Sequence, residues 1–173
     1  MFNGKTNSMI NIGHYQACAC VGRANPDSMC DGQHTFVEKG KKVTLKPKAG
    51  EEAIAVVIDG CVCADNDTKC DGMFLYKRSN KRWIILVELK GVDIEHAFEQ
   101  LAYTKMHRPE YKEIQRLFSE ENRHFLTEKM FIVSNRIIHK VEHKKLENKY
   151  KIRVSPILHS VATTPIPNLR TYL

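Results

Sequence analysis

The chain has 173 residues, enough for one globular domain with a packed core, and its 42% apolar and 27% charged residues exclude wholesale disorder. A formal net charge of +7 favours a polyanionic partner, nucleic acid in particular, over a basic protein that is merely soluble. No run approaches the roughly 20 apolar residues of a membrane span, so no membrane partner is expected.

The N-terminal half predicts strands that follow one another closely. Residues 1–34 show no sustained period and are expected to be irregular. Short strands at 35–37 and 42–45 flank a turn at Lys39-Gly40-Lys41, which is typical of a hairpin. Further strands are predicted at 53–63, with a turn or bulge at Asp59-Gly60, and at 70–76 and 83–90. Three strands so closely linked predict an antiparallel meander.

The segment from Trp83 to Lys90 places charges at the end of an apolar strand. Its β-branched and aromatic residues predict a strand buried on both faces. Alternation then puts Glu88 and Lys90 on the same face as Ile84 and Leu86. Burying such charges costs several kcal/mol each unless they are compensated. A divalent cation together with a phosphodiester would compensate them.

The C-terminal half predicts helices alternating with strands. Asp93 can cap a helix whose apolar positions begin at Ile94 and recur with helical spacing. Pro109 interrupts that helix. The elements expected after it are a helix at 111–118 that extends at most to Phe125, a strand at 129–134, a polar helical turn at 143–148, a strand at 152–155 and an extended tail at 163–173. This order predicts an α/β domain with a mixed sheet.

Asp71, followed after a hairpin by Glu88-Leu89-Lys90, resembles the PD-(D/E)XK nuclease superfamily, which has the restriction-endonuclease-like fold. The resemblance covers residues 53–135 in element order, and Cys70 stands where the motif has proline. It implies a single nuclease-like domain over 1–173, with an irregular or hairpin extension at 1–50, a core at 51–160 and an extended tail at 161–173. The family's first helix, which often adds a glutamate, is not evident. The upstream acidic candidates are Glu38, Glu51, Glu52 and Asp59.

The resemblance implies a site for Mg²⁺ or Mn²⁺. Asp71, Glu88 and the main-chain carbonyl of Leu89 would bind the ion, and Lys90 would orient the attacking water or stabilise developing charge. Oxygen ligands suit these ions better than zinc. The alternative interpretation makes Asp71 a turn residue and Glu88 and Lys90 an ion pair on an edge strand.

Two further groups of residues are candidates for substrate contacts. The segment Gln100 to Tyr103 looks like the glutamine and tyrosine on the helix after the motif in RecB-like members, so Gln100 would contact the substrate or a metal-bound water; a solvated glutamine is the alternative. The basic turn can position a phosphate backbone, and its members are Lys77, Arg78, Lys81 and Arg82. Further basic residues are Lys105, His107, Arg108, Lys140, Lys144 and Lys145.

The cysteines are expected to be reduced thiols or metal ligands, because Met1 to Lys5 shows no secretory signal and the default location is cytoplasmic. One alternative is a structural site for zinc or an iron–sulfur cluster. Its ligands would be Cys18, Cys20 and Cys30, joined by His14 or His34. The other cysteines, Cys61, Cys63 and Cys70, are expected to be small core residues.

The sequence therefore predicts a magnesium-dependent endonuclease or phosphodiesterase acting on DNA, with RNA left open as a substrate. It would act as a homodimer or with a protein partner that confers specificity. Two rival hypotheses remain. One is a non-catalytic module that binds nucleic acid or protein on the same fold, and the other is an interaction module stabilised by a cysteine-bound metal.

Overall fold

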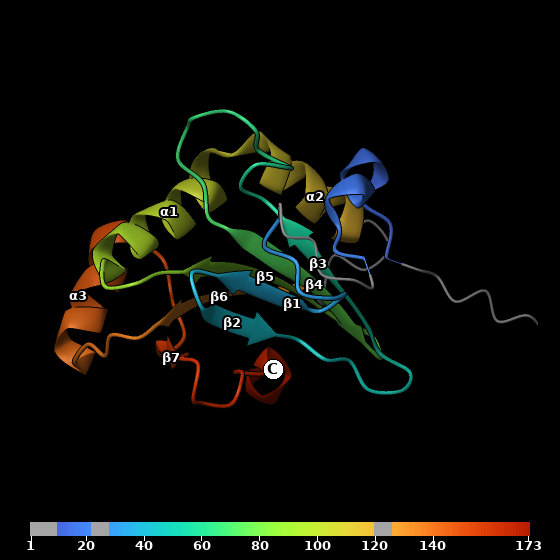
Figure 1. Cartoon of the computed structure of the whole chain (residues 1–173). Helices are drawn as coiled ribbons and strands as arrows, with labels where there is room; N and C mark the ends of the chain where they lie inside the picture. Colours follow the sequence, from blue (N-terminus) through green and yellow to red (C-terminus); the bar gives the residue numbers. More distant parts are fainter. Residues whose placement is uncertain (1–9, 22–27, 120–125) are drawn as a thin grey trace, which may run out of the picture.

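A computed structural model describes residues 10–21, 28–119 and 126–173 and shows a mixed α/β protein (Figure 1). The five-stranded sheet has the order β3-β4-β5-β6-β7, formed by Glu52–Val57, Gly72–Arg78, Lys81–Leu89, Leu126–Ser134 and Leu158–His159. A separate hairpin pairs β1 (Thr35–Glu38) with β2 (Lys41–Thr44). The helices are α1 (Ile94–His107), α2 (Pro109–Ser119) and α3 (Lys140–Tyr150), with 3-10 helices η1 (Gly13–Cys18) and η3 (Leu169–Tyr172). None of the helices in these ranges is long and apolar enough to cross a bilayer.

The predicted antiparallel meander is confirmed. Strands β3, β4 and β5 pair antiparallel, and β5 then pairs parallel with β6 after the chain has passed through α1 and α2. Strand β5 is therefore central, with β4 on one side and β6 on the other. All of its residues after Lys81 are buried, as the run of β-branched side chains predicted.

Each face of the sheet has its own cover. Ile84 and Leu86 of β5 pack with α1, α2 and η1 in one apolar cluster. Ile85 and Val87 point the other way, into a cluster formed with the β1–β2 hairpin and the C-terminal Leu169. Figure 1 shows these layers, with α1 and α2 on one side of the sheet and the hairpin on the other. Alternation along one strand thus builds two separate cores.

Local signals for turns and caps hold where the structure describes them. Lys39 and Gly40 both have positive φ, 47° and 79°, which is the two-residue turn that matches strand twist in a hairpin. Asp93 caps α1, and its side chain accepts a hydrogen bond from the His96 amide at 3.0 Å. The predicted turn at Asp59-Gly60 is also present, with Gly60 at φ 85°.

Several predicted boundaries are wrong. Strand β3 ends at Val57 rather than at Cys63, because the amides of Ile58 and Asp59 both donate to the Asp71 carbonyl and draw the chain into a turn. The predicted strand at 152–155 is not a strand, and pairing with β6 occurs instead at Leu158–His159, beyond Pro156. The possible extension of the second helix to Phe125 lies outside the described residues.

The C-terminal elements are more ordered than predicted. The expected short turn at 143–148 is part of the 11-residue helix α3, whose His143 and Tyr150 rings pack on Phe98 of α1. The expected extended tail contains η3, in which Leu169 is fully buried. Arg170 also forms hydrogen bonds with the Glu51 carboxylate at 2.5–3.0 Å.

Gly72, the first residue of β4, is required by the hairpin that covers it. A Cβ at this position would lie 2.7 Å from Cζ of Phe36 and 2.9 Å from Cε of Met29. Phe36 is fully buried and packs on Phe74, so it has little room to move. We expect Gly72→Ala to lower the free energy of unfolding by about 1–3 kcal/mol, measured by urea denaturation.

Gly91→Ala is the matched control for this substitution. A Cβ there would meet no atom within 4 Å, and Gly91 does not have a positive φ. Alanine at that position should therefore be neutral or slightly stabilising, because it restricts the unfolded chain. Equal stability of the two variants would contradict close packing of the hairpin on β4.

Candidate active site

Asp71 and Glu88 meet at the neighbouring ends of β4 and β5. Gly72 pairs with Val87, so the residue before β4 lies beside Glu88. The Asp71 amide donates to Oε2 of Glu88 at 2.9 Å, and the Leu89 amide donates to Oδ2 of Asp71 at 2.8 Å. Each carboxylate is thus held by the backbone of the other strand. The prediction that these residues lie on neighbouring strands is confirmed.

Both carboxylates are buried, with Asp71 8% and Glu88 1% exposed. The pKa of Asp71 is raised to about 6, chiefly by burial and also by nearby Glu38 and Asp59, although the Leu89 amide and Lys90 lower it. Burial and the adjacent Asp71 also raise the pKa of Glu88 well above its usual range, against the effect of Lys90. The positive charge of Lys90 therefore does not offset the effect of burial on the two carboxylates.

Lys90 lies on the same side as Glu88, as alternation predicted. Its Nζ is 3.2 Å from Oε1 of Glu88, and its side chain is mostly buried. The ion pair of the alternative interpretation is therefore present, but its placement on an edge strand is wrong, since β5 is central in the sheet. Asp71 does lie at a bend, but its carboxylate binds the backbone of β5 rather than its own turn.

The upstream acidic candidates separate into two pairs. Glu51 binds Arg170, and Glu52 accepts a hydrogen bond from the Ile10 amide at 3.0 Å, so both are engaged elsewhere. Glu38 and Asp59, together with Asp71, line an open cavity of about 930 Å³ beneath the N-terminal segment. Glu38 and Asp59 are therefore the two upstream residues that remain candidates for the additional acidic residue of the site.

The donor set fits a hard cation that keeps part of its water shell. Among the described residues, no three His, Cys, Asp or Glu side chains gather as a metal-binding group. Two carboxylates are enough for Mg²⁺, which usually binds one or two of them and completes its octahedron with water and phosphate oxygens. Oδ1 of Asp71 accepts no hydrogen bond from the described residues, so this oxygen is available to a ligand.

Gln100 of α1 anchors the segment that leads to Asp71. Its Nε2 donates to the Lys69 carbonyl at 3.0 Å, while its Oε1 is buried without a partner among the described residues. Thr104, one turn later, accepts a hydrogen bond from the Cys70 amide at 2.8 Å. Gln100 is therefore not simply solvated, and its role toward substrate stays a prediction. Thr104 was not identified from the sequence. A hydroxyl beside the apolar face of α1 could have indicated a buried hydrogen bond at this position.

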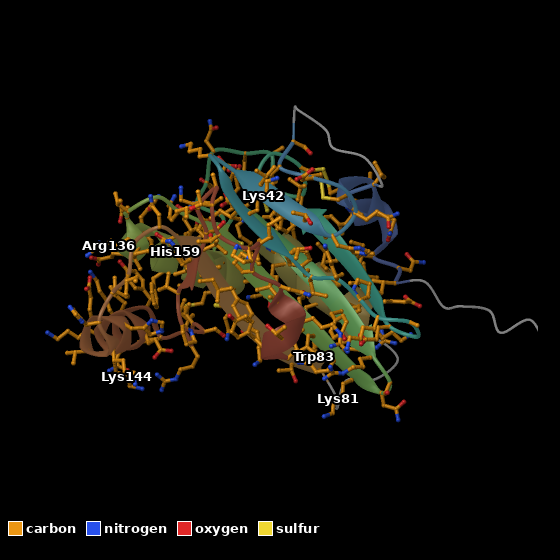
Figure 2. The ribbon with its side chains drawn as sticks, turned by 60° about the horizontal axis from the view of Figure 1, so that its bottom comes forward. Lys42, Lys81, Trp83, Arg136, Lys144 and His159 are labelled. Carbon is orange, nitrogen blue, oxygen red and sulfur yellow. A yellow bond between two sulfur atoms is a disulfide. The ribbon has the colours of Figure 1, made fainter. Side chains whose placement is uncertain are left out.

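The basic turn and Tyr103, also predicted to contact substrate, are not brought to this site. The basic turn Lys77 to Arg82 lies at the opposite end of β4, about 20 Å away for a seven-residue strand. Arg82 is buried and donates to the Phe118 carbonyl at 2.6 Å, and Arg78 stacks over the Trp83 ring. Figure 2 shows Lys81 and Trp83 far from Arg136 and His159. His159 pairs with Ser134 at the end of β6 and Arg136 binds the Val92 carbonyl, so both lie at the end of the sheet where β5 ends. The ring of Tyr103 packs on His107 of its own helix.

The expectation of thiolate ligands is wrong in this structure. Disulfides join Cys18 to Cys61 and Cys20 to Cys30, so these sulfur atoms are not available as thiolates for zinc or an iron–sulfur cluster. His14 instead stacks on Tyr15, and a ring nitrogen of His34 lies 3.0 Å from the Ala53 carbonyl. Cys63 and Cys70 are free and buried, as predicted, whereas Cys61 is exposed.

The raised pKa of Asp71 predicts a dependence of stability on pH in EDTA. The folded state holds this proton up to about pH 6 and the unfolded chain only to about pH 4, so stability falls as pH rises between those values. A shift of about two units corresponds to a loss of about 3 kcal/mol. In Asp71→Asn the part of this fall that comes from Asp71 should be absent, because the amide does not titrate, whereas the part that comes from the buried Glu88 remains. Urea titrations at pH 4 and 7 measure the difference, and parallel pH profiles would contradict the shift.

The chain was compared with known protein families, curated proteins and solved structures. No family model, no curated protein and no solved structure matches the chain. The description of the protein therefore depends on its fold and its candidate site. It is a mixed α/β protein with a five-stranded sheet, and the buried pair Asp71 and Glu88 lies with the partly buried Lys90 at the end of its central strand.

Proposed function

We propose that this protein is a metal-dependent nuclease that hydrolyses phosphodiester bonds in DNA through a site of the PD-(D/E)XK type. The observation that carries the proposal is the buried pair Asp71 and Glu88, each bound by the other strand's backbone, with Lys90 on the same face. Structural ion pairs are seldom buried with two carboxylates and one ammonium, because the excess negative charge destabilises the fold. A cation and an anionic substrate balance this excess.

The order of elements supports the proposal. The antiparallel strands β3, β4 and β5, then α1, then the parallel strand β6, follow the order on which the resemblance rests over residues 53–135. The restriction-endonuclease-like fold and membership of that superfamily are parts of the proposal. Cys70 takes the place of the motif's proline, and it fits there as a fully buried small side chain whose amide binds Thr104.

The residues have distinct roles in this proposal. Asp71, Glu88 and the Leu89 carbonyl would hold one Mg²⁺ or Mn²⁺, which supplies charge neutralisation at the scissile phosphate and lowers the pKa of a water molecule. Lys90 carries a positive charge at the border of the buried pair, where it stabilises negative charge that develops on the phosphate oxygens. The backbone hydrogen bonds to both carboxylates fix their positions before substrate binds.

DNA is proposed as the substrate because of the resemblance, and the net charge of +7 supports a polyanion in general. The test is cleavage of labelled supercoiled, linear and single-stranded DNA, and of RNA, by the full chain with Mg²⁺ or Mn²⁺ and with EDTA. Cutting that EDTA abolishes supports the nuclease, and the substrate cut best defines its class. Binding to DNA with no cutting under any metal would overturn the proposal in favour of a binding module.

A further inference from the structure

The loops that follow β5 and β6 form one continuous surface beside the candidate site. Oγ of Ser134 donates to the Gly91 carbonyl at 2.5 Å, and Nη1 of Arg136 donates to the Val92 carbonyl at 3.1 Å. The Lys90 amide also donates to the Val133 carbonyl at 2.8 Å. These bonds hold the start of the β6–α3 connection against the residues that follow Lys90. Arg136 therefore lies at the same end of the sheet as the carboxylates (Figure 2).

Helix α3 extends this surface with unneutralised positive charge. The neighbouring acidic groups are already engaged, because Glu142 pairs with Arg136, Glu95 with Lys149 and Glu147 with Arg153. The remaining exposed lysines of α3 are Lys140, Lys144 and Lys145. Within the described ranges, none of these three has an acidic group at ion-pair distance. We call these three lysines and Arg136 the α3 basic surface.

Exposed aliphatic side chains lie among these charges. Ile137 is 83% exposed, Val141 69% and Val92 67%, the highest values for large apolar residues in the described part of the chain. Ile137 follows Arg136 directly, Val141 lies in the first turn of α3, and the Val92 carbonyl is bound by Arg136. Nucleic acid offers both phosphates for the lysines and sugar and base surfaces for aliphatic side chains.

We propose that the α3 basic surface, together with the exposed Ile137 beside Arg136, is where nucleic acid docks. The inference rests on the proposed function, because the surface begins at the residues that follow Lys90 and so leads a bound backbone toward Asp71 and Glu88. The lysines contact phosphates, and Ile137 lies against sugar or base. The β4–β5 turn, about 20 Å from the carboxylates, is then not the main binding surface.

The test compares two triple variants with the same change in charge. Lys140→Ala/Lys144→Ala/Lys145→Ala removes charge from α3. The control, Lys46→Ala/Lys48→Ala/Lys81→Ala, removes three exposed lysines from the end of the sheet where β3 begins and β4 ends. Affinity for a labelled 20-bp duplex and for a single strand is measured in EDTA, where cleavage is suppressed, across a range of salt concentrations. A third variant, Ile137→Ser, tests the apolar contact.

Each phosphate contact contributes about 8-fold to affinity at 0.1 M salt, so the α3 variant should bind tens to hundreds of times more weakly. The slope of log affinity against log salt should also fall by about 2–3, while the control binds like the wild type. Ile137→Ser should weaken binding without changing that slope.

Two results would overturn the inference: an α3 variant that binds like the wild type, or a control that loses as much affinity. A change in oligomeric state of the α3 variant, seen by sedimentation, would assign the surface to self-association instead. The proposed function fails separately, because a wild type that binds through α3 but never cuts with Mg²⁺ keeps the docking surface and loses the nuclease.

Discussion

Replacing Lys90 by alanine is expected to slow metal-dependent cleavage by about 10²- to 10³-fold. A pre-positioned positive charge beside developing negative charge contributes on that scale in enzymes. The substitution also removes the cation that lies beside the Glu88 carboxylate, which is 1% exposed, since Nζ of Lys90 lies 3.2 Å from Oε1. Single-turnover cleavage with enzyme in excess over DNA measures the effect, because substrate affinity then does not limit the rate.

Lys112→Ala is the matched control for this experiment. Lys112 is an exposed lysine of α2, on a different element from the cluster, so its loss removes the same charge without touching the carboxylates. Both variants should bind a duplex in EDTA and show cooperative unfolding, which separates a catalytic defect from a folding defect. Equal cleavage rates for the two variants would remove Lys90 from the reaction and leave the Glu88 contact as a structural ion pair.

The central part of the fold could be predicted because its signals are local. Strand β5 is an unbroken apolar run, so burial on both faces followed from the side chains themselves. Only a short turn separates β4 from β5, and this fixed their antiparallel pairing. The placement of Asp71 beside Glu88 was a consequence of that pairing. The cap of α1 at Asp93 was equally local.

The parts that failed depend on contacts between residues far apart in the chain. The C-terminal segment 163–173 contains Pro165 and Pro167, which predicted an extended tail. It is ordered because Leu169 fills a gap in the core under the hairpin and because Arg170 binds Glu51, 119 residues earlier. Periodicity within a short window carries no information on such contacts.

The position of the basic residues relative to the site also could not be predicted from the sequence, because it depends on the tertiary structure. Charge density along the sequence drew attention to the turn between β4 and β5, where four basic residues lie within six positions. The hairpin that joins Asp71 to Glu88 places this turn at its other end, so the same geometry that builds the site separates it from the turn. Helix α3 begins about fifty residues after Glu88, yet its Glu142 pairs with Arg136, which binds the Val92 carbonyl just beyond the site.

The cysteine spacing failed for a different reason. Cys18 and Cys20 are two residues apart, which suggested joint ligation of one metal. In the structure this segment runs along the edge of β3, where the Cys20 amide donates to the Ala55 carbonyl at 2.7 Å. Cys18 ends the 3-10 helix η1 and Cys20 lies on the extended segment after it, and each finds its own partner, Cys61 or Cys30. The sequence offers no signal for that pairing.

Removing the disulfides is expected to cause a large loss of stability. The loop closed by Cys18 and Cys61 spans 43 residues and that closed by Cys20 and Cys30 spans 10, so loop entropy gives upper estimates of about 4 and about 3 kcal/mol. Cys18→Ser/Cys61→Ser should therefore destabilise the protein more than Cys20→Ser/Cys30→Ser. At about 2–4 °C per kcal/mol, its Tm should fall by about 10 °C.

Both disulfides also line the cavity that contains Asp71, Glu38 and Asp59, so the same variants should lose cleavage activity below their unfolding temperatures. The count of reactive thiols in the unfolded, unreduced protein checks the pairing directly. Six cysteines less four in disulfides leave two, Cys63 and Cys70. A count of six, with the serine variants as stable as the wild type, would show the thiols to be reduced and would restore Cys18, Cys20 and Cys30 as candidate metal ligands. A count of two thiols would show that the cavity beside Asp71 is formed with both disulfides intact.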